Sequence, residues 1–262
     1  MKSKTEKRSP LKDKPLRYAG QSLDEQIEDK LLEAIYWILV SCGSVIIAII
    51  EWARYLNPQS TPPFSSTIIA VVILIVGADK IFKGRKEAKR LAMARDGEKL
   101  VAEGLQEMIK QGATVLNDIQ SDKFNVDHVV VSTNGIYLIE TKTFSKPAKK
   151  DAKISFNSED VFADGFLVDR NPIQQAKALA KWLQELLMQS TGIKFAIRPV
   201  VLFPGWFIEP MKRGQEVWIL NPKALPTFVS NEPVLLKETD VYLVAFHLSR
   251  YIRTFTPKQE KS

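Results

Sequence analysis

The sequence has very few of the residues that build disulfide frameworks or metal sites from sulfur and imidazole. It holds one Cys and two His among 262 residues. A single Cys excludes a disulfide framework and a cysteine-based zinc site, and two His leave little for an imidazole-rich metal centre. With 12 Gly, 14 Pro and 45% hydrophobic residues, the composition also excludes a collagen-like, low-complexity or disordered chain. These exclusions leave one large globular domain, or a domain with an appendage.

The positive charge of the chain is unevenly distributed. The formal net charge is +7, which suggests nucleic acid or a membrane surface as a partner. Residues 1–30 carry 8 basic and 6 acidic side chains and residues 79–95 carry 7 and 2, whereas residues 96–262 carry 21 and 20. The excess therefore lies in the first third of the chain, and a purely electrostatic nucleic-acid binder is disfavoured.

Two apolar runs lie beside these basic segments. Ala34–Ile50 contains 17 residues without a charge, which is the lower limit for crossing a bilayer. The second run, Thr67–Ala78, is shorter, but it has 19 residues when it is extended to Phe64–Phe82. The connection at 51–66 contains three Pro but only one basic residue, Arg54. By the positive-inside rule, this pattern predicts a transmembrane hairpin with both termini in the cytoplasm, in a multi-pass protein of the cell inner membrane. The alternative is a pair of buried core helices.

The remainder of the chain alternates between helical and strand patterns. We divide the sequence into a polar basic tail (1–30), a transmembrane helical hairpin (31–84) and a cytoplasmic domain (85–262). Within the domain, helices are predicted at 85–110, 172–190 and 240–253, strands at 127–132, 136–143, 198–203 and 217–220, and a weak strand pair within 152–168. Asn171 and Pro172 are typical of a helix N-cap and first helical position. The order predicts a mixed α/β domain with a central sheet flanked by helices.

A hairpin brings two acidic residues and one basic residue together. Asn134-Gly135 between two β-branched runs predicts a type I′ turn, with Asp127 opposite Lys142. Asp127, Glu140 and Lys142 would then share one end of one face. The alternative is an exposed salt bridge between Asp127 and Lys142 at the strand end.

Such a cluster has a chemical use. Two buried carboxylates are unfavourable unless a cation neutralises them, and Mg²⁺ prefers hard oxygen ligands while keeping some of its water. A metal held this way can activate a water and stabilise charge developing on a phosphate. A neighbouring Lys can orient the nucleophile.

Two further polar residues fall on apolar helix faces. Glu98 shares a helical stripe with Val101, Leu105 and Met108, and Gln175 points inward. A Glu on a core stripe needs a partner, which a metal or Lys142 can supply. The alternatives are local: Glu98 could begin a new helix, and Gln175 lies in a first turn.

At these residues the sequence resembles the NERD family, the nuclease-related domain of the PD-(D/E)XK phosphodiesterase superfamily. The resemblance covers about residues 96–205, and its matching pieces are Gly97-Glu98, Asn117-Asp118, NVDHVVVSTNGIYLIETK at 125–142, NPIQQA at 171–176 and RPVVLFPG at 198–205. Val126 stands where the superfamily's motif has Pro.

The resemblance implies a restriction-endonuclease-like core. By position, it makes Asp127, Glu140 and Glu98 the metal-binding carboxylates, Lys142 the catalytic lysine and Gln175 the glutamine of the next motif. We therefore expect a membrane-anchored nuclease that uses Mg²⁺ or Mn²⁺ to hydrolyse DNA or RNA. The alternative is a catalytically silent NERD-type domain that acts as a membrane-tethered nucleic-acid-binding or protein-interaction module.

Overall fold

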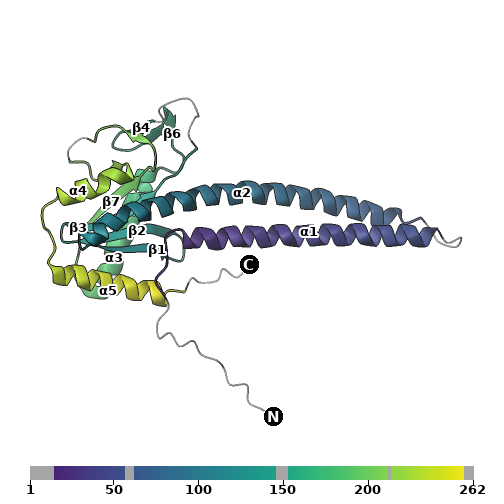
Figure 1. Cartoon of the computed structure of the whole chain (residues 1–262), viewed down its shortest axis with the longest axis horizontal. Coiled ribbons are helices and arrows are strands. Elements are labelled where there is room, and N and C mark those ends of the chain that lie inside the picture. Colours follow the sequence, from purple (N-terminus) through teal and green to yellow (C-terminus); the bar gives the residue numbers. More distant parts are fainter. Residues whose placement is uncertain (1–14, 57–61, 146–152, 212–213, 257–262) are drawn as a thin grey trace, which may run out of the picture. The chain divides into compact units, whose positions relative to one another are not determined.

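The chain forms two compact units. The computed structural model describes residues 15–56, 62–145, 153–211 and 214–256 (Figure 1). One unit spans residues 22–95, and the other combines the described parts of 1–21 and 96–262. Residues 1–14 of the predicted N-terminal tail, and Pro58 in the predicted connection, lie outside the described residues. The two units are described separately below.

The first unit consists of two long helices with exposed apolar side chains. Helix α1 spans Gln21–Tyr55, and α2 spans Phe64–Lys110, so the second apolar run and the helix predicted from residue 85 are one continuous helix. Each contains a stretch long and apolar enough to cross a membrane. Leu39 and Ile75 are 66% and 65% exposed. Core helices would bury such side chains, so the alternative of two core helices is not supported.

Small residues let these two helices pack closely. A Cβ on Gly77 would lie 2.6 Å from Ser41 Oγ. Near the ends that lead to the connection, Trp52 Nε1 donates a hydrogen bond to Thr67 Oγ1 at 2.8 Å. Close approach through small residues is typical of paired membrane helices, which gain little hydrophobic energy from each other in lipid.

The second unit is built on a five-stranded mixed sheet. Its strands, in spatial order, are β1 (Thr114–Gln120), β2 (Asn125–Ser132), β3 (Gly135–Thr141), β7 (Ile197–Leu202) and β9 (Trp218–Leu220). The first three strands pair antiparallel, whereas β7 and β9 run parallel to β3. This confirms the predicted mixed α/β class; β1 was not predicted.

Helices cover both faces of this sheet. On one face, α3 (Pro172–Thr191) and α5 (Glu238–Thr254) pack on alternate residues of β2 and β3, such as Val129 and Leu138. On the other face, the last turns of α2 and the short α4 (Leu225–Ser230), which follows a 3-10 turn at Pro222–Ala224, pack on the intervening residues. The period of two therefore sends successive side chains of each strand into different cores.

A second, smaller sheet lies beyond Thr141. It contains β4 (Lys153–Phe156), β5 (Val161–Ala163), β6 (Phe166–Leu167) and β8 (Phe207–Ile208), in the order β6-β5-β4-β8. The strand pair predicted within 152–168 is confirmed. Its buried side chains share a third core with the start of α3, where Asn171 caps the helix as predicted by accepting hydrogen bonds from the N–H groups of Ile173 and Gln174.

Candidate metal centre and active site

The β2–β3 hairpin turns earlier than predicted. Ser132 pairs with Gly135, so Thr133 and Asn134 are the two turn residues. Tertiary contacts explain the difference, since Asn134 Nδ2 donates to the Glu232 carbonyl at 2.7 Å. The Asn-Gly dipeptide therefore ends the turn instead of forming its centre.

The earlier turn changes the register of the β2–β3 pair but not the face of the sheet on which each side chain lies. Continuing the pairing one residue past the His128–Ile139 pair brings Asp127 level with Glu140, so the predicted pairing of Asp127 with Lys142 is wrong by two residues. Because side chains alternate with a period of two, a shift of two leaves every side chain on its predicted face. The correction brings the two carboxylates onto directly neighbouring positions.

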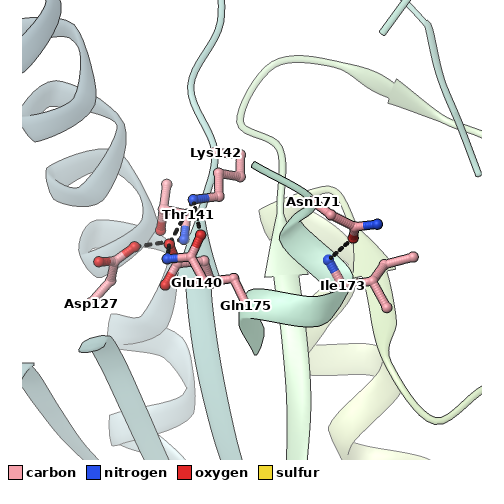
Figure 2. A network of polar contacts seen from close by, with 7 residues as sticks. All are labelled: Asp127, Glu140, Thr141, Lys142, Asn171, Ile173 and Gln175. Atoms are coloured by element: carbon pink, nitrogen blue, oxygen red, sulfur yellow. Dashed lines mark hydrogen bonds and ion pairs between the residues drawn. The ribbon is translucent and has the colours of Figure 1, made fainter. Parts of the chain in front are cut away.

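Asp127 is buried at the start of this arrangement. It is 7% exposed, and its Oδ2 accepts a hydrogen bond from the Thr141 backbone N–H at 2.6 Å (Figure 2). Its pKa is raised well above the ordinary 3.8, first by burial and then by the negative charges of Glu140 and Glu98. The hydrogen bond from the Thr141 N–H and the charge of Lys142 lower the pKa but do not cancel this rise. Asp127 is therefore a carboxyl group whose ionisation needs a nearby cation.

Glu140, Lys142 and Gln175 form a closed triangle of contacts (Figure 2). Glu140 Oε1 accepts from Lys142 Nζ at 2.8 Å and from Gln175 Nε2 at 2.6 Å, and Gln175 Oε1 accepts from Lys142 Nζ at 2.8 Å. The ion pair of Lys142 is thus with Glu140 and not with Asp127. Burial raises the pKa of Glu140, while Lys142 and Gln175 lower it. Gln175 points inward as predicted.

Helix α2 brings Glu98 to the end of β3. Glu98 is 5% exposed and lies on the predicted buried stripe with Val101 and Leu105, within an unbroken helix. The residue before it makes this approach possible, since a Cβ on Gly97 would lie 2.0 Å from Thr143 Oγ1. Only glycine lets the helix come this close to the extension of β3.

Electrostatics tie Glu98 to the other carboxylates. Burial, followed by the charges of Asp118 and Glu140, raises its pKa to about 8; a hydrogen bond from the Gly20 backbone and the charge of Lys142 lower the pKa. The carboxyl groups of Asp118 and Glu140 therefore both lie within electrostatic reach of Glu98, although the three residues come from three different elements.

Asp118 also belongs to this group, although no pattern of individual residues predicts it. The β1–β2 register places it level with Asp127, and it is fully buried with a left-handed φ of 52°. Its carboxylate accepts from Asn125 Nδ2 at 2.6 Å and forms an ion pair with Arg17. The only sequence signal was the Asn117-Asp118 pair inside the family resemblance.

The donor set fits a hard divalent cation. Among the described residues, no three His, Cys, Asp or Glu side chains converge on one point as a ready-made ion site. However, the buried oxygens Glu98 Oε2 and Glu140 Oε2 accept no hydrogen bond, and three neighbouring carboxyl groups have raised pKa values. Oxygen donors with that surplus of negative charge match the preferences of Mg²⁺.

The domain thus combines a mixed sheet, an acidic hairpin with an E-x-K tripeptide, and acidic and amide residues on flanking helices. Residues 94–204 match the family model described as nuclease-related domain, NERD, whose general context is the PD-(D/E)XK superfamily. This part of the chain is therefore similar to the nuclease-related domain. No match is found among curated proteins or among solved structures.

Proposed function

We propose that this protein is a membrane-anchored, divalent-metal-dependent phosphodiesterase that hydrolyses DNA or RNA. The observation that carries the proposal is the group of buried carboxyl groups, with raised pKa values, gathered around Lys142 and Gln175 inside a nuclease-related domain. Burying several carboxyl groups together is costly unless a cation joins them, so a purely structural role explains the cluster poorly.

The residues would divide the work by position. Glu98, Asp127 and Glu140 would hold Mg²⁺ or Mn²⁺, which when bound supplies an acidified water and stabilises charge on a phosphate. Lys142 would position the attacking water, because its side chain is 20% exposed, whereas that of its ion-pair partner Glu140 is buried. Gln175 holds Lys142 and Glu140 at once and would keep both side chains in place.

The two apolar helices would anchor this domain in a membrane. Their exposed apolar side chains and the basic residues that flank the runs support an inner-membrane hairpin with both termini in the cytoplasm. Anchoring would confine cleavage to nucleic acid near the membrane surface.

The test compares full-length wild type with Lys142→Met in detergent micelles. Each is incubated with single- and double-stranded DNA and RNA in the presence of Mg²⁺, Mn²⁺ or a chelator. We expect metal-dependent cleavage by wild type and a loss of about 100-fold or more in Lys142→Met, the range for a group that positions a nucleophile.

A matched lysine gives the control. Lys181 lies exposed on α3, so Lys181→Met removes the same charge away from the carboxyl groups and should cleave like wild type. Cleavage that resists chelator, or equal cleavage by Lys142→Met and wild type, would contradict the proposed mechanism.

A second candidate is a catalytically silent module that binds nucleic acid or protein at the membrane. It is favoured by the near-neutral charge of residues 96–262, with 21 basic and 20 acidic side chains, because nucleases often carry a basic groove. It predicts no binding of Mn²⁺ by wild type, whereas the phosphodiesterase predicts binding that Asp127→Ala abolishes.

A further inference from the structure

The short segment before α1 is packed into the acidic centre instead of extending away as a tail. This segment, residues 15–20, is called the strap below; Ala19 and Gly20 at its end are buried. Arg17 in the strap forms an ion pair with Asp118, whose side chain is fully buried. The strap then runs directly into α1 at Gln21.

The strap also reaches Glu98. The backbone N–H of Gly20 donates a hydrogen bond to the Glu98 carboxylate, while Glu98 Oε2 accepts none from the residues that the structure describes. Gly20 has a φ of 76°, a conformation that favours glycine. One oxygen of Glu98 is therefore held by the strap and the other is left for a ligand.

Arg17 also compensates the negative charge of the Asp118 carboxylate. Asp118 lies close enough to Glu98 to raise the pKa of that carboxyl group. Arg17 and Asn125 Nδ2 both contact the buried carboxylate of Asp118, and removing the ion-pair partner of a buried charge is strongly unfavourable. The ion pair thus fastens the strap to Asp118.

We infer that the strap is a positioning element of the metal centre, in which Arg17 on Asp118 fastens the chain so that Gly20 orients Glu98. The inference rests on the proposed metal-dependent function and deepens it. Arg17 does not touch the metal or substrate; it acts through Glu98. Groups that orient metal ligands in this way typically contribute about 10- to 100-fold to metal affinity or activity.

The test measures Mn²⁺ affinity, cleavage and amide hydrogen exchange of the full-length chain in detergent micelles. In Arg17→Ala we expect faster exchange in residues 15–21, a Mn²⁺ Kd raised by about 10-fold or more, and a lower kcat with unchanged KM for nucleic acid. Arg17→Lys keeps the charge and should recover part of the Mn²⁺ affinity. Asp118→Asn, which removes the same ion pair from the other side, should match Arg17→Ala and serves where that variant folds poorly.

Arg198→Ala is the matched control. Arg198 lies in β7, donates to backbone carbonyls and stacks on Trp218, so its loss removes an equally well-packed arginine far from the strap. It should leave the Mn²⁺ Kd unchanged. Unchanged Kd in Arg17→Ala and Asp118→Asn, or an equal rise in Arg198→Ala, would overturn the role of the strap while leaving the proposed function intact. Absence of Mn²⁺ binding and cleavage in wild type would overturn both.

Discussion

At the scale of single residues, the main finding is that carboxyl groups dominate the energetics of the candidate site. Asp127, Glu140 and Glu98 are each at most 7% exposed, and each has a raised pKa. Burial is the first cause in every case, and mutual repulsion adds to it for Asp127 and Glu98. Without a bound cation, the folded domain must hold protons that the unfolded chain would release.

This proton uptake predicts how stability depends on pH. The pKa of Glu98 is raised from 4.5 to about 8, so between these values the folded state keeps a proton that the unfolded state loses. Stability of the metal-free protein should therefore fall as pH rises through this window. At about 1.4 kcal/mol per pKa unit, the contribution of Glu98 amounts to a few kcal/mol.

Glu98→Gln removes this titration while keeping the size of the side chain. We expect the variant, in chelator, to lose less stability between about pH 5 and about pH 8 than wild type does, with the residual slope due to Asp127 and Glu140. Thermal unfolding of both proteins across this range measures the difference. Parallel curves for the two proteins would show that Glu98 is not protonated in the fold.

At the scale of elements, the site depends on where α2 meets the extension of β3. Gly97 lies against Thr143, and it is the contact between these two residues that brings Glu98 to the other carboxyl groups. Gly104, two turns further along the same helix, has no heavy atom within 4 Å of the position its Cβ would take. Replacing each of these glycines by alanine therefore separates the effect of helix propensity on stability from the effect of packing.

Gly97→Ala should destabilise the protein, by about 1–3 kcal/mol, because a Cβ there must push the helix away from Thr143. Gly104→Ala should stabilise it by up to about 1 kcal/mol, since alanine favours the helix and meets no neighbour. Denaturant unfolding of the two variants measures these changes. Equal effects on stability would mean that the close approach of Gly97 to Thr143 is not needed for the fold. In addition, Mn²⁺ affinity should fall in Gly97→Ala and not in Gly104→Ala.

The elements also show how far local patterns predict the fold. The strands corresponding to β2, β3, β7 and β9 and the helix α3 with its Asn171 cap were predicted, because alternation and capping are local properties. β1 was missed, since Asn117 and Asp118 interrupt its apolar pattern. The turn was misplaced because the Thr133 carbonyl accepts from the N–H groups of Leu235 and Leu236, a contact far along the chain.

At the scale of the whole molecule, the chain joins a mixed α/β domain that matches the nuclease-related family model to two helices long and apolar enough to cross a bilayer. The single Cys of the sequence, Cys42, lies in the apolar stretch of α1 and is exposed in the structure. If this stretch spans a membrane, lipid covers Cys42; if it lies in water, the thiol is accessible. One residue therefore reports on the environment of the helix.

We expect a water-soluble maleimide to leave Cys42 unlabelled in opened membrane fragments and to label it once the protein is unfolded in detergent, because the reagent does not enter the hydrocarbon region. Glu103→Cys in a Cys42→Ser background is the control, since Glu103 is exposed on the part of α2 that belongs to the domain, and this thiol should be labelled in both conditions. Rapid labelling of Cys42 in membranes would contradict a membrane span.

The sequence by itself determined most of the elements, β1 excepted, and the candidate chemistry. Apolar run length, alternation with a period of two and the helical stripe that holds Glu98 are encoded over a few neighbouring residues, and a register error of two cannot move a side chain to the other face. The tertiary structure alone decided that Asp118 and the segment before α1 join these carboxyl groups. Asp118 and Gly20 reach Glu98, and Arg17 reaches Asp118, only through contacts between segments far apart in the chain, and no local pattern encodes such contacts.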